Sequence, residues 1–232
     1  MTIPLKAELP GLRLAWLAWV EPVTPPEQAQ TFLRYNIYRR EPPETAWVRI
    51  GIVEVQSTAA YTDYAVRSGA VYEYTVTVTV TVNATTPEGV KQAAPARGRA
   101  LFDGNFLHDA NEATEYAQVP SYQVQVEQQQ DMQFQRVWGR TAPTAQVGEV
   151  IANHVTISGL PDAYRREQWR DIVALTARQR DVAAMLCLRL GRAQTLMFCQ
   201  VAGAGRALGQ KSYDPSIELQ EVYYNEAVEV SA

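Results

Sequence analysis

The segment YTDYAVRSGAVYEYTVTVTVTVN, residues 61–83, carries the pattern that decides the fold of the first half of the chain. From Thr75 to Asn83 valine and threonine alternate almost without interruption. A period of two places successive side chains on opposite faces of a β-strand. We therefore expect one strand here, with its valine face packed on a core and its threonine face in contact with water.

Outward from this strand, the chain up to residue 102 consists of short β-type runs separated by Pro and Gly, with no helical period. In LRLAW, two leucines and Trp16 fall on one face of a strand. In FLRYNIYRR, the residues expected to point inward are Leu33, Tyr35 and Ile37, or their neighbours. The pattern predicts an all-β first domain.

Several of these runs resemble the fibronectin type III domain, and the resemblance covers roughly residues 4–102. Its carriers are LRLAW with Trp16, YNIYRR, and YTDYAVRSGAVYEYTVTV, in which Tyr-x-Asp leads through a Gly turn into Tyr-x-Tyr-x-Val. The resemblance implies a two-sheet β-sandwich with residues 75–82 in the penultimate strand, paired on both sides. It also implies that Tyr72 is a corner tyrosine, whose ring caps the core and whose hydroxyl bonds to the backbone.

The overall composition, 232 residues of which 47% are hydrophobic, with a net charge of -4, fits two domains that each bury a core. An acidic chain supplies no cationic footprint, so we expect no direct nucleic-acid readout. No run matches a secretion signal or reaches the apolar length of a spanning helix, so we expect no membrane insertion.

The composition shifts after the first domain. Residues 103–120 are polar, contain Gly and Pro and lack a strong period, which favours a linker or an extended arm. Residues 121–232 read as a second, mainly β domain, a sandwich or barrel, with one helix over about residues 161–180. The expected apolar stripe of that helix, at i, i+3, i+4 and i+7, is Trp169, Ile172, Val173 and Thr176.

The run VAAMLCLRLGRAQTLMFCQVAG reads as two strands around a turn. If Leu190 pairs with Thr195, the three leucines share a face with Cys199, and Cys187 points to the other side. A shift of one residue would set the cysteines opposite each other, but would also put Gln200 on the leucine face. We therefore expect the first register and two reduced cysteines.

Residue types suited to catalysis are sparse. The two histidines, His108 in the expected linker and His154 on an expected strand, have no Gly-x-Ser-x-Gly elbow with them, and we expect no catalytic site. His108, Asp109 and Glu112 could bind a divalent ion, but so short an acidic loop is commonly solvated, and we expect neither metal nor cofactor. Residues 203–212, GAGRALGQKS, lack the spacing of dinucleotide and phosphate loops and predict a flexible loop.

The second domain, about residues 119–229, is similar in the order and size of its elements to the tail-tube and distal-tail proteins of long-tailed bacteriophages. The carriers are VWGRTAPTAQVGEV, the Trp-bearing helix, the MLCLRLGRAQTLMFCQV hairpin and the terminal IELQEVYY. The resemblance implies threefold or sixfold homo-oligomeric rings, contacts with other tail proteins, and a place in the virion after synthesis in the host cytoplasm. The fibronectin-like domain would then face outward, where many weak contacts with a host surface add up.

The strand pattern gives a separate reason to expect assembly. SYQVQVEQQQDMQFQ carries amides where an edge strand of a monomer often carries Lys or Glu, and residues 119–229 contain a single lysine. Such a strand can add to a neighbour's sheet, although a monomer whose glutamines face water fits the same pattern. The expected subunit-interface residues are Gln123, Gln125, Gln128, Gln133, Gln135, Trp138 and Arg140.

Two other classes of function are open. A bacterial surface or carbohydrate-binding protein with a fibronectin-like spacer would need a surface row of aromatics, for which Trp47, Tyr61 and Tyr64 are the candidates. An accessory module of a carbohydrate-active enzyme would need paired carboxylates, and no such pair stands out. The sequence therefore predicts a non-enzymatic structural protein of a phage tail, with the surface or carbohydrate-binding protein as the alternative.

Overall fold

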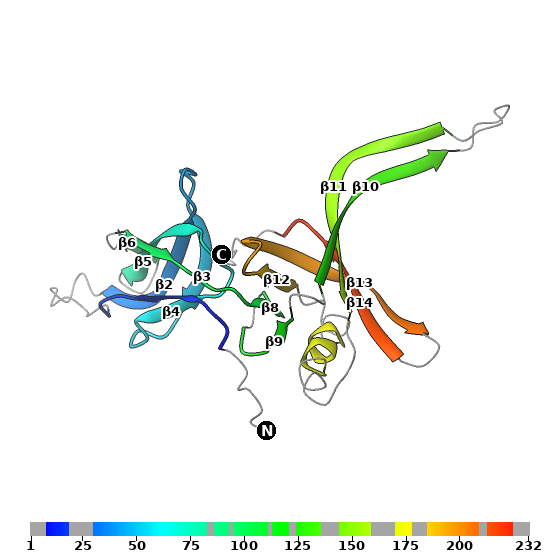
Figure 1. Ribbon diagram of the computed structural model, residues 1–232. Helices are drawn as coiled ribbons and strands as arrows, with labels where there is room; N and C mark the ends of the chain where they lie inside the picture. Colours follow the sequence, from blue (N-terminus) through cyan, green and yellow to red (C-terminus); the bar gives the residue numbers. More distant parts are fainter. Residues whose placement is uncertain are drawn as a thin grey trace, which may run out of the picture. The chain divides into compact units, whose positions relative to one another are not determined.

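The computed structural model describes residues 8–18, 30–82, 86–92, 95–110, 113–120, 124–135, 144–158, 170–177, 185–208 and 213–224. Within these residues the protein is mainly β, as predicted, with three sheets and one helix (Figure 1). The chain divides into two compact units, one containing Pro10–Phe102 and the other Asp103–Tyr223. The boundary after Phe102 coincides with the end of the predicted first domain.

The unit Pro10–Phe102 contains two antiparallel sheets that pack as a β-sandwich. The smaller sheet pairs β1 (Leu12–Ala15) with β4 (Ala60–Asp63). The larger sheet has the order β3-β2-β5-β6, with β7 also paired to β5: β2 (Gln30–Arg40), β3 (Val48–Val53), β5 (Val71–Val82), β6 (Thr86–Gln92) and β7 (Ala96–Arg99).

The core between the two sheets is apolar and partly aromatic. Trp16, just after β1, meets Tyr35 on β2 edge to face, with ring centroids 5.3 Å apart. Leu33 does not point inward, since a bulge between Phe32 and Arg34 leaves it 38% exposed and Phe32 packs on the core instead. The buried residues of this contact are Tyr35, Ile37, Val76, Val78 and Val80.

Strand β5 is paired on both sides, as predicted, with β2 on one side and β6 and β7 on the other. The prediction that its threonine face meets water is wrong, because Thr75, Thr77 and Thr79 are buried. Asn36 on β2 lies opposite Thr77, and its amide nitrogen donates to the hydroxyls of Thr77 and Thr79 at 3.1 and 2.9 Å. Hydrogen bonding among these side chains allows a polar face to be buried.

The second unit contains one antiparallel seven-stranded sheet of order β10-β11-β14-β13-β12-β8-β9. Its strands are β8 (Asn105–Asp109), β9 (Tyr116–Val119), β10 (Val124–Gln135), β11 (Thr144–Ser158), β12 (Leu186–Leu190), β13 (Thr195–Leu208) and β14 (Tyr213–Glu221).

The predicted linker over residues 103–120 is not a linker. β8 pairs with β12 and β9 pairs with β8, so this stretch forms one end of the seven-stranded sheet. Leu107 packs in the core, and His108 on the other face is also fully buried. The prediction failed because a strand buried on both faces shows no alternation of apolar and polar residues.

Two other loop boundaries differ from the sequence prediction. The patterns in TAPTAQVGEV and NHVTISGL each predict a short strand, but Thr144–Ser158 form one continuous strand, β11. Residues 203–208 of the expected flexible loop belong to β13, after a register shift between Val201 and Gly203, while residues 209–212 lie outside the described part. Glycine normally weakens a strand, so its density here favoured the wrong prediction.

The leucine hairpin has the predicted register. Leu190 pairs with Thr195 and Leu186 with Cys199, while Cys187 pairs with Phe198 on the opposite face. Both cysteines are free and buried, and burial, followed by Cys187 and Glu221, raises the pKa of the Cys199 thiol to about 12.

The helix, described over residues 170–177, packs on the leucine face of the sheet through Ile172 and Leu175. Its buried stripe is rotated from the predicted one, because Val173 is 43% exposed while Leu175 is buried; Ile172 and Thr176 are buried as predicted. Trp169 and the other residues of the predicted helix outside 170–177 lie beyond the described residues.

Candidate assembly interface

The seven-stranded sheet is open, with β10 at one edge and β9 at the other. In the described part of the chain, β10 pairs only with β11, and β9 pairs only with β8. An edge strand presents a row of main-chain N–H and C=O groups to which another strand can add.

Strands β10 and β11 continue beyond the sheet as a two-stranded ribbon (Figure 1). β11 pairs with β10 along nearly its whole length, but with β14 only from His154 to Ser158. From Gln128 to Gln135 the ribbon therefore has no third strand among the described residues. At about 3.4 Å per residue, this projecting part is roughly 24 Å long.

The ribbon contains a large bulge near its middle. Gln130 pairs with Ile151 and Met132 pairs with Val147, so residues 148–150 of β11 stand opposite the single residue Asp131. Extra residues on one strand bend a ribbon and increase its twist, and Figure 1 shows the ribbon curving along its length. The bulge therefore sets the direction of the outer half of the ribbon.

The predicted interface residues on the inner half of β10 are solvent-exposed. Gln125 and Gln128 are both exposed, and Val126 between them is 43% exposed. Val124 packs on the core, whereas Val126, the next residue on the same face, is exposed. The alternation of apolar residues therefore continues beyond the end of the core.

The other predicted interface residues are less completely described. Gln133 and Gln135 lie on the outer half of β10, where only the backbone is described. Gln123, Trp138 and Arg140 lie outside the described residues. β10 therefore brings Gln125, Gln128, Gln133 and Gln135 onto one edge strand, and their role in subunit contacts stays a prediction.

The base of the ribbon contains polar residues that sequence reasoning missed. Glu221 on β14 accepts hydrogen bonds through Oε2 from the backbone N and the Nδ2 of Asn153 on β11, at 3.3 and 2.5 Å. The sequence held one signal: in the alternation of buried Ile217 and Leu219, the next position is a glutamate instead of an apolar residue.

The aromatic residue Tyr61 is engaged within the sandwich. Its ring packs against Gly51, where an added Cβ would lie 2.7 Å from the ring, and its hydroxyl donates to the Ile50 carbonyl at 3.1 Å. Burial, followed by the charge of Asp63, raises the pKa of Tyr61 to about 12. Tyr61 is therefore a core residue more than a surface contact.

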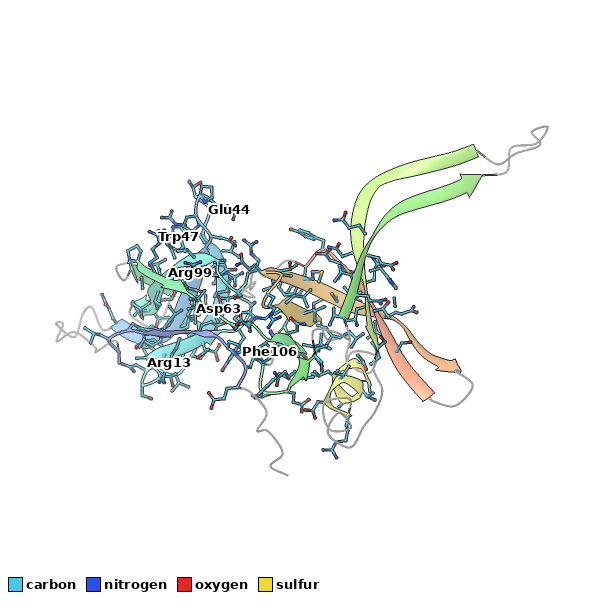
Figure 2. All side chains as sticks on the ribbon, viewed as in Figure 1. Arg13, Glu44, Trp47, Asp63, Arg99 and Phe106 are labelled. Atoms are coloured by element: carbon cyan, nitrogen blue, oxygen red, sulfur yellow. The ribbon has the colours of Figure 1, made fainter. Side chains whose placement is uncertain are left out.

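Trp47 and Tyr64 contact different neighbours. Trp47 stacks with Arg40, whose guanidinium carbon lies 4.5 Å from the ring centroid, on the β2–β3 side of the sandwich (Figure 2). The ring of Tyr64 lies beside Gly11, where an added Cβ would come within 2.9 Å of it. These contacts do not bring Trp47, Tyr61 and Tyr64 together into one aromatic row.

A buried carboxylate, Asp63 at the end of β4 (Figure 2), organises the segment that leads to β5. It accepts hydrogen bonds from Arg39 Nη1, the Tyr74 hydroxyl and the Ala65 backbone N, each at 2.9 Å. Burial, followed by the charge of Asp63, raises the pKa of Tyr74. The contacts of the Asp63 carboxylate are therefore structural.

Tyr72 makes the hydrogen bond to the backbone that was expected of it. The hydroxyl of Tyr72 accepts a hydrogen bond from the backbone N of Arg67 at 3.0 Å, and its ring lies in a buried cluster with Val66 and Tyr74. Burial raises the pKa of the Tyr72 hydroxyl, so it remains protonated.

The two histidines lie on separate strands of the second unit. Buried His108 on β8 places Nδ1 2.8 Å from the Asp109 carbonyl oxygen, and His154 on β11 places Nε2 3.9 Å from Glu218 Oε2. Within the described residues, no three His, Cys, Asp or Glu side chains gather as a metal site would require, and Glu112 lies outside them.

Comparisons with known proteins give no family for the chain: no protein-family model and no curated protein matches it. Among the described residues, no helix has both the length and the apolar character needed to span a membrane. Among the surfaces of the described residues, the ribbon with its edge strand departs most from an ordinary closed domain.

Proposed function

We propose that this chain is a non-enzymatic structural component of a bacteriophage tail. Its second unit would join copies into a ring through the β10 edge, and its fibronectin type III-like first unit would be displayed outward in the virion. The observation that carries the proposal is the two-stranded ribbon of β10 and β11, which projects from the edge of an open sheet (Figure 1).

Physical reasons support assembly through this ribbon. An isolated two-stranded ribbon is at best marginally stable in water, so a projecting one gains stability from a partner. β10 contains the acidic residues Glu127 and Asp131 but no Arg, and it has neither Lys nor Pro, which are common devices against edge pairing. A strand from a second copy would pair with the exposed main-chain groups, and repeated head-to-tail contacts close a ring when the rotation permits.

The sandwich of the first unit supports its assignment as a displayed module. Its sheet arrangement and the hydrogen bond at Tyr72 agree with the fibronectin type III resemblance. In many copies, weak contacts of such modules with a host surface would add up. A carbohydrate-binding protein has less support, because Tyr61 is packed in the sandwich and Trp47 is stacked with Arg40.

The proposal is tested by light scattering with size-exclusion chromatography and by electron microscopy of the purified chain at tens of micromolar. The wild-type protein is expected to form rings. The double variant Gln125→Lys/Gln128→Lys places two charges on the exposed edge and is expected to weaken association by about tenfold.

The matched control is Gln200→Lys. Gln200 is also an exposed glutamine of the same sheet, but it lies on β13, which is paired on both sides by β12 and β14. This control should assemble like the wild type. A wild-type chain that stays monomeric with no rings, or equal loss of assembly in both variants, would contradict the proposal.

A further inference from the structure

The ribbon begins where the pairing between β11 and β14 stops. The last pair of that ladder is His154 with Gln220, and the next residues toward the ribbon are Asn153 and Glu221. Asn153 still pairs with Gln128 on β10. On its other side, its main-chain N–H and C=O groups face β14 beyond the end of the ladder.

Side chains of β14 bind both of these main-chain groups. Glu221 Oε2 accepts from the Asn153 backbone N at 3.3 Å, and Gln220 Nε2 donates to the Asn153 carbonyl oxygen at 3.4 Å. Glu221 Oε2 also accepts from Asn153 Nδ2 at 2.5 Å. Hydrogen bonds to a carboxylate are charge-assisted and stronger than neutral ones, so the side chains extend the ladder by one residue.

The same residues lie at the border of the apolar core. Val155 and Ile157 follow Asn153 on the core face of β11, and Leu219 precedes Glu221 on that face of β14; all three apolar residues are buried. Glu221 in turn pairs with buried Cys199 on β13. The core therefore ends against a hydrogen-bonded polar pair at the point where the ribbon leaves the sheet.

We propose that Gln220 and Glu221 clamp Asn153 and thereby fix the direction in which the β10–β11 ribbon leaves the sheet, with Glu221 as the positioning residue. The clamp itself is inferred from contacts within this chain. Only its role in assembly rests on the proposed function, in which a neighbouring copy would bind a ribbon of fixed direction. Fixing the ribbon in advance lowers the entropic cost of association.

The central test is Glu221→Ala in the full chain, studied in dilute solution. Glu221→Gln is the conservative variant, because its side-chain oxygen still accepts from Asn153. Glu218→Ala is the matched control, because it removes a different carboxylate from the same strand. The Glu218 carboxylate contacts His154 Nε2, at 3.9 Å. Asn153→Asp, which sets a carboxylate against Glu221, is a second disruptive variant.

Two measurements report whether the clamp is intact. The first is hydrogen exchange of the Asn153 amide, which should become about tenfold faster in Glu221→Ala and Asn153→Asp and stay near wild type in Glu218→Ala. The second is the distance distribution between spin labels on cysteines introduced at Gln133 and Arg192, both in the second unit. The two native thiols are buried, so labelling is selective.

In the disruptive variants the label distances should broaden, while Glu221→Gln and Glu218→Ala keep the wild-type distribution. Unchanged exchange protection from His154 to Ser158 would show that the sheet itself is intact. The inference is overturned if Glu221→Ala and Asn153→Asp leave both readouts unchanged, or if Glu218→Ala broadens the distances equally. Neither readout needs assembly, so an absence of rings would count against the proposed function alone.

Discussion

Asp63 shows how a carboxylate can be accommodated in the core of the first unit. The side chain is 3% exposed, yet Arg39, Tyr74 and the Ala65 backbone N all donate to it. Removing one member of a buried ion pair leaves the other charge without compensation, which costs far more than breaking an exposed pair.

Asp63→Ala is therefore expected to lower the free energy of unfolding of the first unit by about 3–5 kcal/mol, measured by urea denaturation. The matched control is Glu73→Ala, which breaks an ion pair with Arg40 whose side chains are 22% and 29% exposed. That variant should lose at most about 1 kcal/mol, because partly exposed pairs are screened by water. Equal losses in the two variants would show that the Asp63 network has no special role.

At the residue scale, the sequence predicts contacts within a short segment better than contacts between distant ones. The hydroxyl of Tyr72 bonds to the backbone of Arg67, five positions earlier, and the resemblance carried by this segment implied a bond to the backbone. The burial of Thr77 and Thr79 depends on Asn36, which lies more than forty positions earlier on another strand. A valine–threonine alternation cannot show what stands beside it in the sheet.

At the scale of elements, β8 is the strand that the sequence hides best. Its two faces are both buried, so NFLHD has the polar residues of a loop without the period of a strand. The register of the leucine hairpin was predictable because parity is a local property and only one register kept Gln200 off the leucine face.

Leu107→Ala distinguishes a core strand from a linker. Leu107 is fully buried on β8, so its truncation should lower the free energy of unfolding by about 2–5 kcal/mol. The control is Leu101→Ala, a leucine just before the second unit that is 73% exposed, for which a change within about 0.5 kcal/mol is expected. Chemical denaturation of the two variants gives the comparison, and a neutral Leu107→Ala would restore the linker interpretation.

The ribbon could not be predicted from the sequence of β10 and β11 alone. The glutamine-rich alternation predicted strands with edge character, but the length of the projecting part depends on where β14 stops pairing with β11. At that point Asn153 is bound by Glu221, which lies 68 positions away in the sequence. Long-range pairing of this kind leaves no periodic signal in either segment.

At the scale of the whole molecule, each unit has its own buried clusters. The core of the second unit includes Leu188, and that of the first includes Ile37. Calorimetry should therefore resolve two unfolding transitions, one for each unit. Leu188→Ala should lower the free energy of unfolding of the second unit, and Ile37→Ala that of the first, each by about 2–5 kcal/mol. A single transition that both variants lower equally would contradict independent units.

The way β11 joins the sheet also determines how the ribbon responds to mechanical force. Hydrogen bonds between antiparallel strands run perpendicular to the strands. A pull along the ribbon loads the pairs from His154 to Ser158 with β14 simultaneously, in shear, whereas a sideways pull peels them one after another from the Asn153 end. The junction is therefore expected to resist axial tension better than transverse tension, which single-molecule pulling in the two directions would measure.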